Sequence, residues 1–356
     1  MNRRAFLAVS ATGLAVAGGA AALGQERSQP DLAKVVTTLA DLLERGYVVP
    51  ATGTRYAAML RGKLAGGSYS AIGDADALAV RLTNDLAAVS PDRHLRVMNE
   101  RALPSGERPA ARHINAPASR STPVPAAAPR RPGRAAIEDA GWIAPGVGYL
   151  RFTGFPDDPA NGAQCETFMH EHATARTLII DCRYNGGGGI VQMNAILPFL
   201  YDRETTLVRM EMVAAVAKVR GGTPFDGEGS VRAVAHPQPG IVAQEHFVVP
   251  RRDETRLFNV PLYYLVSNRT ASAAEHLALA LKRTKRATLI GETTAGANHF
   301  GAFEAIGAGL VVFLPVGRTI DPDTGKDWEG DGIAPDVAVT PTTALQEALK
   351  RTGMAV

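Results

Sequence analysis

At 356 residues, the chain is long enough to bury a large core, and its 46% hydrophobic composition is typical of a globular protein. Its 38 basic residues are nearly balanced by 35 acidic ones, so the composition gives no sign of a nucleic-acid partner. Only two cysteines occur, Cys165 and Cys182, which excludes a disulfide scaffold and leaves open whether they pair or stay as free thiols.

Residues 1–24 predict an export signal. Arg3 and Arg4 precede an apolar run of small residues that ends near Gly24. The arginine pair resembles a twin-arginine signal, which predicts a mature chain that begins near Gln25 and works in the periplasm or outside the cell. An uncleaved membrane anchor is the alternative. No second candidate span follows, so we expect no membrane span in the mature chain.

Residues 25–98 predict a small helical domain, because apolar residues recur at helical spacing over 31–48, 54–67 and 74–89. Residues 99–137 are rich in Pro, Ala and Arg and offer no apolar face to bury. We therefore expect a linker there, and we expect it to be the least ordered internal segment.

The pattern changes in residues 138–345, where short β-prone runs alternate with helical runs. Residues 346–356 are expected to form a C-terminal tail. This alternation predicts an α/β domain with a largely buried sheet. The alternating runs are 147–155, 165–175, 176–185, 191–202, 261–268, 273–282 and 287–294, and a β-rich segment follows at 301–321.

Ser272 lies between a β-prone run and a helical run, at a predicted strand-to-helix turn. Ser272 to Glu275 match a capping box, in which a serine and a glutamate three residues later bind each other's backbone N–H groups. The positive end of a helix also suits a serine nucleophile, because it stabilises a developing oxyanion. This stretch alone does not separate the two interpretations.

Asn185 to Gly189, "NGGGG", follow a buried β-prone run, and glycines there let backbone N–H groups approach a ligand. The alternative is a flexible turn. A Walker phosphate loop is excluded because no GKS or GKT follows. His94 follows a helical run in "SPDRHLRV" and is a candidate general base. His170 and His172 are two residues apart on a predicted helix, so they point to different faces and do not predict a metal site.

Several ordered stretches resemble the C-terminal-processing (tail-specific) serine peptidases. "IIDCRYNGGGG", "VSNRTASAAEHLALALKRTKRATLIGETTAGA" and "DWEGDGIAPDVAV" are similar to the core signatures of that family. "LTNDLAAVSPDRHLRV" is similar to the amino-terminal signature of the branch that includes interphotoreceptor retinoid-binding protein and the tricorn core protease. The resemblance implies a ClpP/crotonase-like catalytic domain after the helices. No PDZ domain fits between Val97 and Gly146, where many members carry one.

The resemblance places the nucleophile at Ser272 and the oxyanion hole at the N–H groups of Gly188 and Ala273. Ala297 stands where many members carry a catalytic lysine, and alanine cannot take a proton. The branch with a Ser-His-Glu triad then implies His94 as the base and Glu329 as the orienting acid.

Alternatives remain open for both of these roles. His276 and His299 are close enough in sequence to the nucleophile or to Ala297 to replace His94 as the base. Glu275 is either a helix cap or a residue that contacts the catalytic residues without contacting the substrate. The acids near Glu329 that could take its place are Asp321, Asp323, Asp327 and Asp331.

The sequence thus predicts an exported serine endopeptidase that acts on peptides or proteins through an acyl-enzyme on Ser272. It predicts no cofactor, no metal and no nucleic-acid partner. The rival is a catalytically inactive family member that binds an apolar ligand or peptide, because fold-level analogy does not establish activity.

Overall fold

The computed structural model describes residues 31–103 and 136–353. The predicted signal at 1–24 lies outside these ranges, and so do residues 104–135 of the predicted linker, 99–137. Within the described ranges, no helix is both long and apolar enough to cross a membrane.

The first described residues form a block of helices, which we call the helical block: α1 Leu32–Gly46, α2 Pro50–Ala65 and α3 Ala75–Val89. The side chain of Asp31 caps α1 by accepting from the N–H of Lys34, and Asp74 caps α3 in the same way. Their apolar faces point inward, as the helical spacing predicts.

A largely parallel sheet forms one layer, in the strand order β12-β9-β8-β4-β3-β2. Only β2 runs antiparallel to its neighbour, β3. Every residue of β4 is buried, as expected for a strand covered on both faces. The strands are β2 Ile137–Ala144, β3 Val147–Phe152, β4 Thr177–Asp181, β8 Leu262–Val266, β9 Thr288–Gly291 and β12 Val337–Ala338.

A second, antiparallel sheet has the order β1-β11-β5-β7-β6, and β10 pairs with the long strand β11. Its strands are β1 Arg96–Asn99, β5 Thr205–Val213, β6 Val231–Val234, β7 Ile241–Val248, β10 Phe300–Gly307 and β11 Leu310–Ile320. Because β1 belongs to the amino-terminal part, this sheet joins that part to the rest of the molecule.

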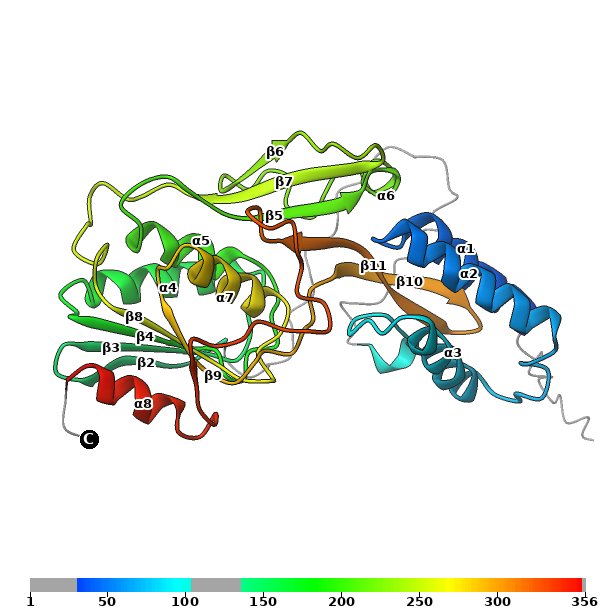
Figure 1. Cartoon of the computed structure of the whole chain (residues 1–356), viewed down its shortest axis with the longest axis horizontal. Helices are drawn as coiled ribbons and strands as arrows, with labels where there is room; N and C mark the ends of the chain where they lie inside the picture. The colour runs from blue at the N-terminus through cyan, green and yellow to red at the C-terminus, as the bar shows by residue number, and fades with distance from the viewer. Residues whose placement is uncertain (1–30, 104–135, 354–356) are drawn as a thin grey trace, which may run out of the picture.

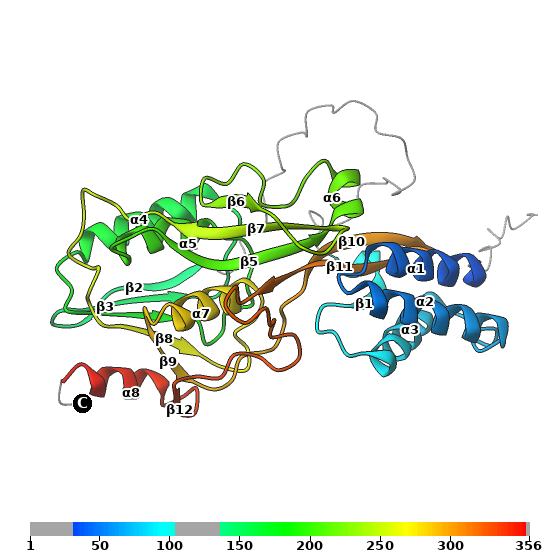
Figure 2. The same ribbon diagram turned by 45° about the horizontal axis from the view of Figure 1, so that its top comes forward.

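Helices α4 and α7 lie between the two sheets, and α8 covers the opposite face of the parallel sheet (Figures 1 and 2). Leu178 and Ile180 of β4 belong to the core between the layers, whereas Ile179 belongs to a smaller core with Ala344 and Ala348 of α8. The remaining helices are α4 Pro159–Glu171, α5 Val191–Ile196, α6 Ala214–Arg220, α7 Ala273–Arg283 and α8 Ala344–Arg351, with short 3-10 helices η1 Glu100–Ala102 and η2 Leu197–Phe199.

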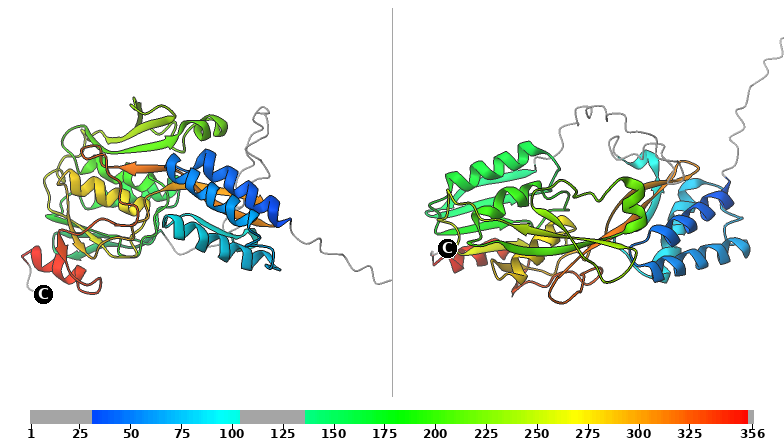
Figure 3. Two further views of the ribbon diagram at one scale, coloured as in Figure 1. Left: turned by 45° about the vertical axis from the view of Figure 1, so that its right-hand side comes forward. Right: turned by 90° about the horizontal axis from the view of Figure 1, so that it is seen from above.

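The helical block packs against one end of β10 and β11 (Figure 3). These strands extend toward it from the rest of the described molecule, the two sheets with α4 to α8, which we call the core. Val36, Leu39 and Leu43 of α1 share one buried cluster with Val312 and Leu314 of β11. The helical block therefore has no separate hydrophobic cluster of its own among the described residues.

The prediction of an α/β domain preceded by helices is confirmed, and the described residues contain no PDZ domain. The strands between 205 and 248 were not predicted. Helix α8 crosses the predicted boundary between residues 345 and 346.

Candidate active site

Ser272 stands between β8 and α7 with a strained backbone. Its φ is 55° and its ψ is −122°, a conformation that L-residues other than glycine rarely adopt. Holding such a residue costs about 1–3 kcal/mol and is typical of functional sites. The turn before it is fixed from the β4 side, because the N–H of Ala271 donates to the Asn185 carbonyl at 3.0 Å and the Thr270 hydroxyl donates to the Cys182 carbonyl at 2.8 Å.

Glu275 is fully buried and fulfils part of the predicted capping box, since its Oε2 accepts the N–H of Ser272 at 2.9 Å. The same carboxylate accepts the N–H of Gly296 at 2.7 Å, the N–H of Ala297 at 2.9 Å and the Thr294 hydroxyl at 2.5 Å. It is therefore more than a cap. It joins the turn that carries Ser272 to the segment 294–299, which we call the 294–299 loop.

The glycine run after β4 lies against Ser272. A Cβ atom placed on Gly187 would lie 2.7 Å from the Cβ of Ser272 and 2.9 Å from the nitrogen of Ala273. Gly187 and Gly188 have φ angles of 94° and 136°, which favour glycine. Backbone hydrogen bonds to Phe155 hold the run in place: Phe155 N–H donates to Gly187 at 2.8 Å, and Gly189 N–H donates to Phe155 at 2.6 Å.

The N–H groups of Gly188 and Ala273 are both available for a ligand. Over the described ranges, neither donates a hydrogen bond to another group of the chain. Gly187 contacts Ser272, Gly188 follows Gly187, and Ala273 follows Ser272, so both donors belong to segments that meet at Ser272. The two N–H groups therefore remain the candidates for an oxyanion hole.

His94 follows α3 and precedes β1, and its ring stacks on Phe313 with centroids 5.4 Å apart. Its Nδ1 is buried without a hydrogen-bond partner. Burial lowers the pKa of His94 to about 4. Within the part of the chain that the structure covers, no hydrogen bond joins His94 to Ser272 or to Glu329.

Glu329 holds backbone groups of two segments. Its Oε1 accepts the N–H of Arg93 at 2.8 Å, and its Oε2 accepts the N–H groups of Asn298 at 2.7 Å and His299 at 3.1 Å. Burial, together with the nearby charge of Asp92, raises its pKa. Glu329 thus binds the backbone of Arg93, the residue that precedes His94, but both oxygens of its side chain are engaged with backbone donors.

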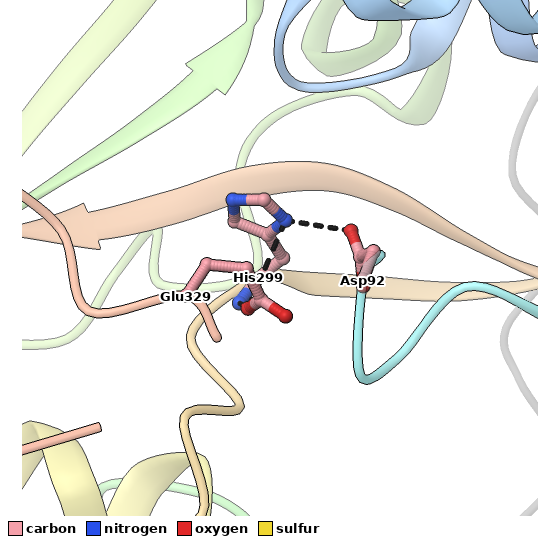
Figure 4. A group of neighbouring side chains, drawn as sticks. All are labelled: Asp92, His299 and Glu329. Carbon is pink, nitrogen blue, oxygen red and sulfur yellow. Dashed lines mark hydrogen bonds and ion pairs between the residues drawn. The ribbon is translucent and has the colours of Figure 1, made fainter. Parts of the chain in front are cut away.

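A side-chain contact that the sequence did not predict joins Asp92 to His299 (Figure 4). His299 Nδ1 lies 2.7 Å from Asp92 Oδ2 and 3.8 Å from Glu329 Oε2. Burial disfavours the charged form of His299, but the hydrogen bond from its ring to Asp92 and the charges of Asp92 and Glu329 outweigh that effect and raise its pKa. His299 Nε2 is buried and has no partner.

Potential ligand atoms of Asp92, His299 and Glu329 all lie within 4.8 Å of one another, so we asked whether this cluster suits a metal ion. The His299 ring and Asp92 are in direct hydrogen-bond contact, and both oxygens of Glu329 already accept backbone N–H groups. Hydrogen bonds within the cluster therefore account for these atoms without an ion.

Several residues that were alternatives for the base or the orienting acid have other partners in the structure. His276 Nε2 lies 2.8 Å from His246 Nδ1 in a buried pair. Arg283 forms ion pairs with Asp321 at 3.4 Å and Asp323 at 2.8 Å. Asp327 pairs with Arg318 at 3.3 Å. The catalytic roles of His94 and Glu329 nevertheless stay predictions.

Cys165 and Cys182 are buried free thiols, and burial raises the pKa of each to about 12. Neither is therefore an activated nucleophile.

Comparison with known proteins matches residues 146–339 to Peptidase family S41, and residues 27–130 to the N-terminal domain of peptidase S41 in eukaryotic IRBP. Carboxyl-terminal-processing peptidase 3, chloroplastic, of Arabidopsis thaliana is 26% identical over 194 residues, which are 54% of this chain and 32% of that protein. C-terminal processing peptidase, chloroplastic, of Tetradesmus obliquus is 27% identical over 195 residues, 55% of this chain and 35% of that protein. The chain spans about a third of the length of these relatives.

Among solved structures, a protein from Parabacteroides merdae has a TM-score of 0.58 and 14% identity, and covers 91% of this chain and 97% of its own. A lipoprotein from Streptococcus agalactiae has a TM-score of 0.52 and 13% identity at the same coverage. At such identities the likeness shows the fold alone, and it extends over the helical block as well as the core. Since the family match spans more than half of the 356 residues, the chain belongs to peptidase family S41.

Proposed function

We propose that the chain is an exported serine endopeptidase that cleaves peptide bonds through an acyl-enzyme on Ser272. The observation that carries this proposal is the strained backbone of Ser272, at φ 55° and ψ −122°, pressed against Gly187. A residue that only caps a helix takes an unstrained, usually extended conformation. Capping alone therefore does not explain why this position bears the cost.

In the proposed reaction, His94 takes the proton of the Ser272 hydroxyl as the oxygen attacks the peptide carbonyl. The N–H groups of Gly188 and Ala273, which have no internal acceptor among the described residues, stabilise the negative oxygen that forms. His94 then protonates the leaving amine, and water releases the acyl group by the reverse roles. The reaction needs no cofactor and no metal.

Burial lowers the pKa of His94 to about 4, so the imidazole is neutral near neutral pH, but it is a weaker base than an imidazole of ordinary pKa. An orienting carboxylate at Nδ1 would raise that pKa toward neutral. The Nδ1 of His94 lacks a partner, which leaves that atom free for an orienting carboxylate. Glu329 is the proposed orienting acid, and its hydrogen bond to the N–H of the preceding residue, Arg93, supports that role.

The proposed substrate is a peptide or a protein, in keeping with the names of the Arabidopsis thaliana and Tetradesmus obliquus relatives. We do not expect capture of a substrate's carboxyl terminus by strand addition to a PDZ domain.

A fluorophosphonate probe tests the central proposal, because it reacts with activated serines. We expect labelling at Ser272 that is lost in Ser272→Ala. A folded wild-type chain that stays unlabelled would favour the rival, an inactive family member that binds an apolar ligand or peptide.

The base is tested by comparing peptidase rates of His94→Ala, His276→Ala, His299→Ala and Glu329→Gln. Triad members act as a unit, so His94→Ala should cost about as much as Ser272→Ala, and Glu329→Gln somewhat less. Activity that survives in His94→Ala and vanishes in His299→Ala or His276→Ala would assign the base elsewhere.

Export is proposed from Arg3 and Arg4, and is tested by the intact mass of the protein recovered outside the cytoplasm. We expect a chain that begins near Gln25. A chain that retains residues 1–24 would contradict cleavage.

A further inference from the structure

Asp92 fixes the short segment 92–95, which we call the base loop, and joins it to the helical block. Its Oδ1 accepts the N–H groups of His94 at 2.8 Å and Leu95 at 3.0 Å. Its Oδ2 accepts the Tyr47 hydroxyl, at the end of α1, at 2.8 Å. The backbone of His94 therefore depends on where this one carboxylate is held.

The core holds that carboxylate through His299. The imidazole is only 4% exposed, and its Nδ1 lies 2.7 Å from Asp92 Oδ2. Glu329 adds a second link between the same segments, because it accepts N–H groups from Arg93 on one side and from Asn298 and His299 on the other. Figure 4 shows His299 between the segments that carry Asp92 and Glu329.

The 294–299 loop leads directly to the nucleophile. Gly296 and Ala297 donate their N–H groups to the carboxylate of Glu275, which also accepts the N–H of Ser272. A continuous path thus runs from the backbone of Ser272 through Glu275, Ala297, His299 and Asp92 to the backbone of His94.

We propose that His299 is a positioning residue. Its hydrogen bond to Asp92 holds the base loop in place relative to the turn that carries Ser272. This inference rests on the proposed function, in which His94 serves Ser272. His299 acts through Asp92 and does not touch the substrate.

The competing explanation is that His299 is itself the base, because Asp92 holds its Nδ1 and leaves its Nε2 without a partner. The two roles differ in what an asparagine would do. His299→Asn keeps a donor near the position of Nδ1, so it should preserve positioning, but it cannot take a proton.

The experiment compares His299→Leu and His299→Asn with a matched control, His172→Leu. His172 is also a buried histidine, 4% exposed, with Nδ1 2.8 Å from a backbone carbonyl and Nε2 buried without a partner. It lies at the end of α4, away from this path. Hydrolysis rates and amide hydrogen exchange of residues 92–95 are measured for each variant.

We expect kcat to fall about 10- to 100-fold in His299→Leu with little change in KM, the scale typical of a misplaced catalytic group. His299→Asn should recover most of this loss, and His172→Leu should stay near wild type. In a His94→Ala background, His299→Leu should add less than about a twofold further loss, since its effect is exerted through His94. The base-loop amides should exchange faster in His299→Leu alone.

Equal losses in His299→Leu and His172→Leu would overturn the proposal, because they would reduce it to general stability. Activity in His94→Ala that His299→Asn abolishes would also overturn it and make His299 the base. If the wild type neither hydrolyses peptides nor reacts with fluorophosphonate, the proposed function fails. Amide hydrogen exchange still tests whether His299 holds the base loop in that case. Unchanged exchange of residues 92–95 in His299→Leu would refute the positioning role.

Discussion

Ser272 shows why the local sequence alone left two interpretations open. The capping interpretation and the nucleophile interpretation use the same residues, and the structure supports part of each: Glu275 does accept the Ser272 N–H, while the Ser272 backbone is strained. Strain is the feature that distinguishes them, because a cap does not need it.

We predict that Ser272→Gly is more stable than Ser272→Ala by about 1 kcal/mol. Glycine adopts φ 55° and ψ −122° at little cost, whereas alanine keeps the Cβ atom that causes the strain. The greater freedom of glycine in the unfolded chain offsets part of the gain. Urea unfolding of both variants measures the difference, and equal stabilities would mean that the strain is no larger than the entropic cost of glycine, about 0.5–1 kcal/mol.

Gly187 and Gly186 form a matched pair for testing the glycine run at the proposed oxyanion hole. A methyl group on Gly187 would lie 2.7 Å from Ser272 Cβ and 2.8 Å from the Ala271 carbonyl oxygen, while one on Gly186 meets nothing within 4 Å. We expect Gly187→Ala to slow hydrolysis about a hundredfold or more and Gly186→Ala to leave it nearly unchanged. Gly188 is a poorer choice, because a Cβ there would overlap the Phe155 backbone. Similar rates for the two variants would remove Gly187 from the site.

At the scale of elements, Glu275 connects the start of α7 to the 294–299 loop. Each of its oxygens accepts two donors: Oε1 from Thr294 and Gly296, and Oε2 from Ser272 and Ala297. No orientation of an amide satisfies all of these donors, because its NH2 group would face two N–H or O–H groups wherever it points.

We therefore predict that Glu275→Gln lowers the free energy of unfolding by about 2–4 kcal/mol, the cost of unsatisfied buried donors. The control is Glu347→Gln on α8, which breaks a partly exposed ion pair with Arg351 and should cost about 0.5 kcal/mol or less. Urea denaturation compares the two. A loss as small as that of the control would show that Glu275 does not hold the loop.

The sequence predicted the helices and strands whose apolar residues recur with a clear period. It did not predict β5, β6 and β7, whose burial does not alternate regularly: β5 has runs of consecutive buried residues, and β6 has no buried residue. It also did not predict the pairing of His299 with Asp92, because the two residues are 207 positions apart. The only sequence signal was their placement, each two residues from a position already singled out, His94 or Ala297.

At the scale of the whole molecule, the helical block and the core share one hydrophobic cluster, while Asp92, His299 and Glu329 lie at their junction. The proposed reaction takes its base from one part and its nucleophile from the other, so it requires the two parts to stay docked. Buried apolar contacts hold the parts together, and the polar cluster fixes their register.

The buried histidines predict how the stability of the whole molecule depends on pH. Burial lowers the pKa of His94 and His276 to about 4, and that of His246 well below its ordinary value, where the neighbouring His276 adds to the effect. The unfolded chain binds protons at these sites below about pH 6.5 while the folded chain does not. Stability should therefore fall as the pH drops below about 6.5, by up to about 1.4 kcal/mol per pH unit for each group.

His299 acts with the opposite sign, because its folded pKa is raised. Its contribution is fully present below the unfolded pKa of about 6.5 and is lost as the pH rises through the folded value. Stability should thus be greatest near pH 6.5 and decline on both sides. Urea unfolding at about pH 5, 6.5 and 8.5 tests this, with His299→Asn as the matched variant. That variant should lose the decline above pH 6.5 and keep the decline below it, since the histidines on the acid side are untouched. If His299→Asn declines above pH 6.5 as steeply as the wild type, the charge on His299 does not stabilise the junction between the helical block and the core.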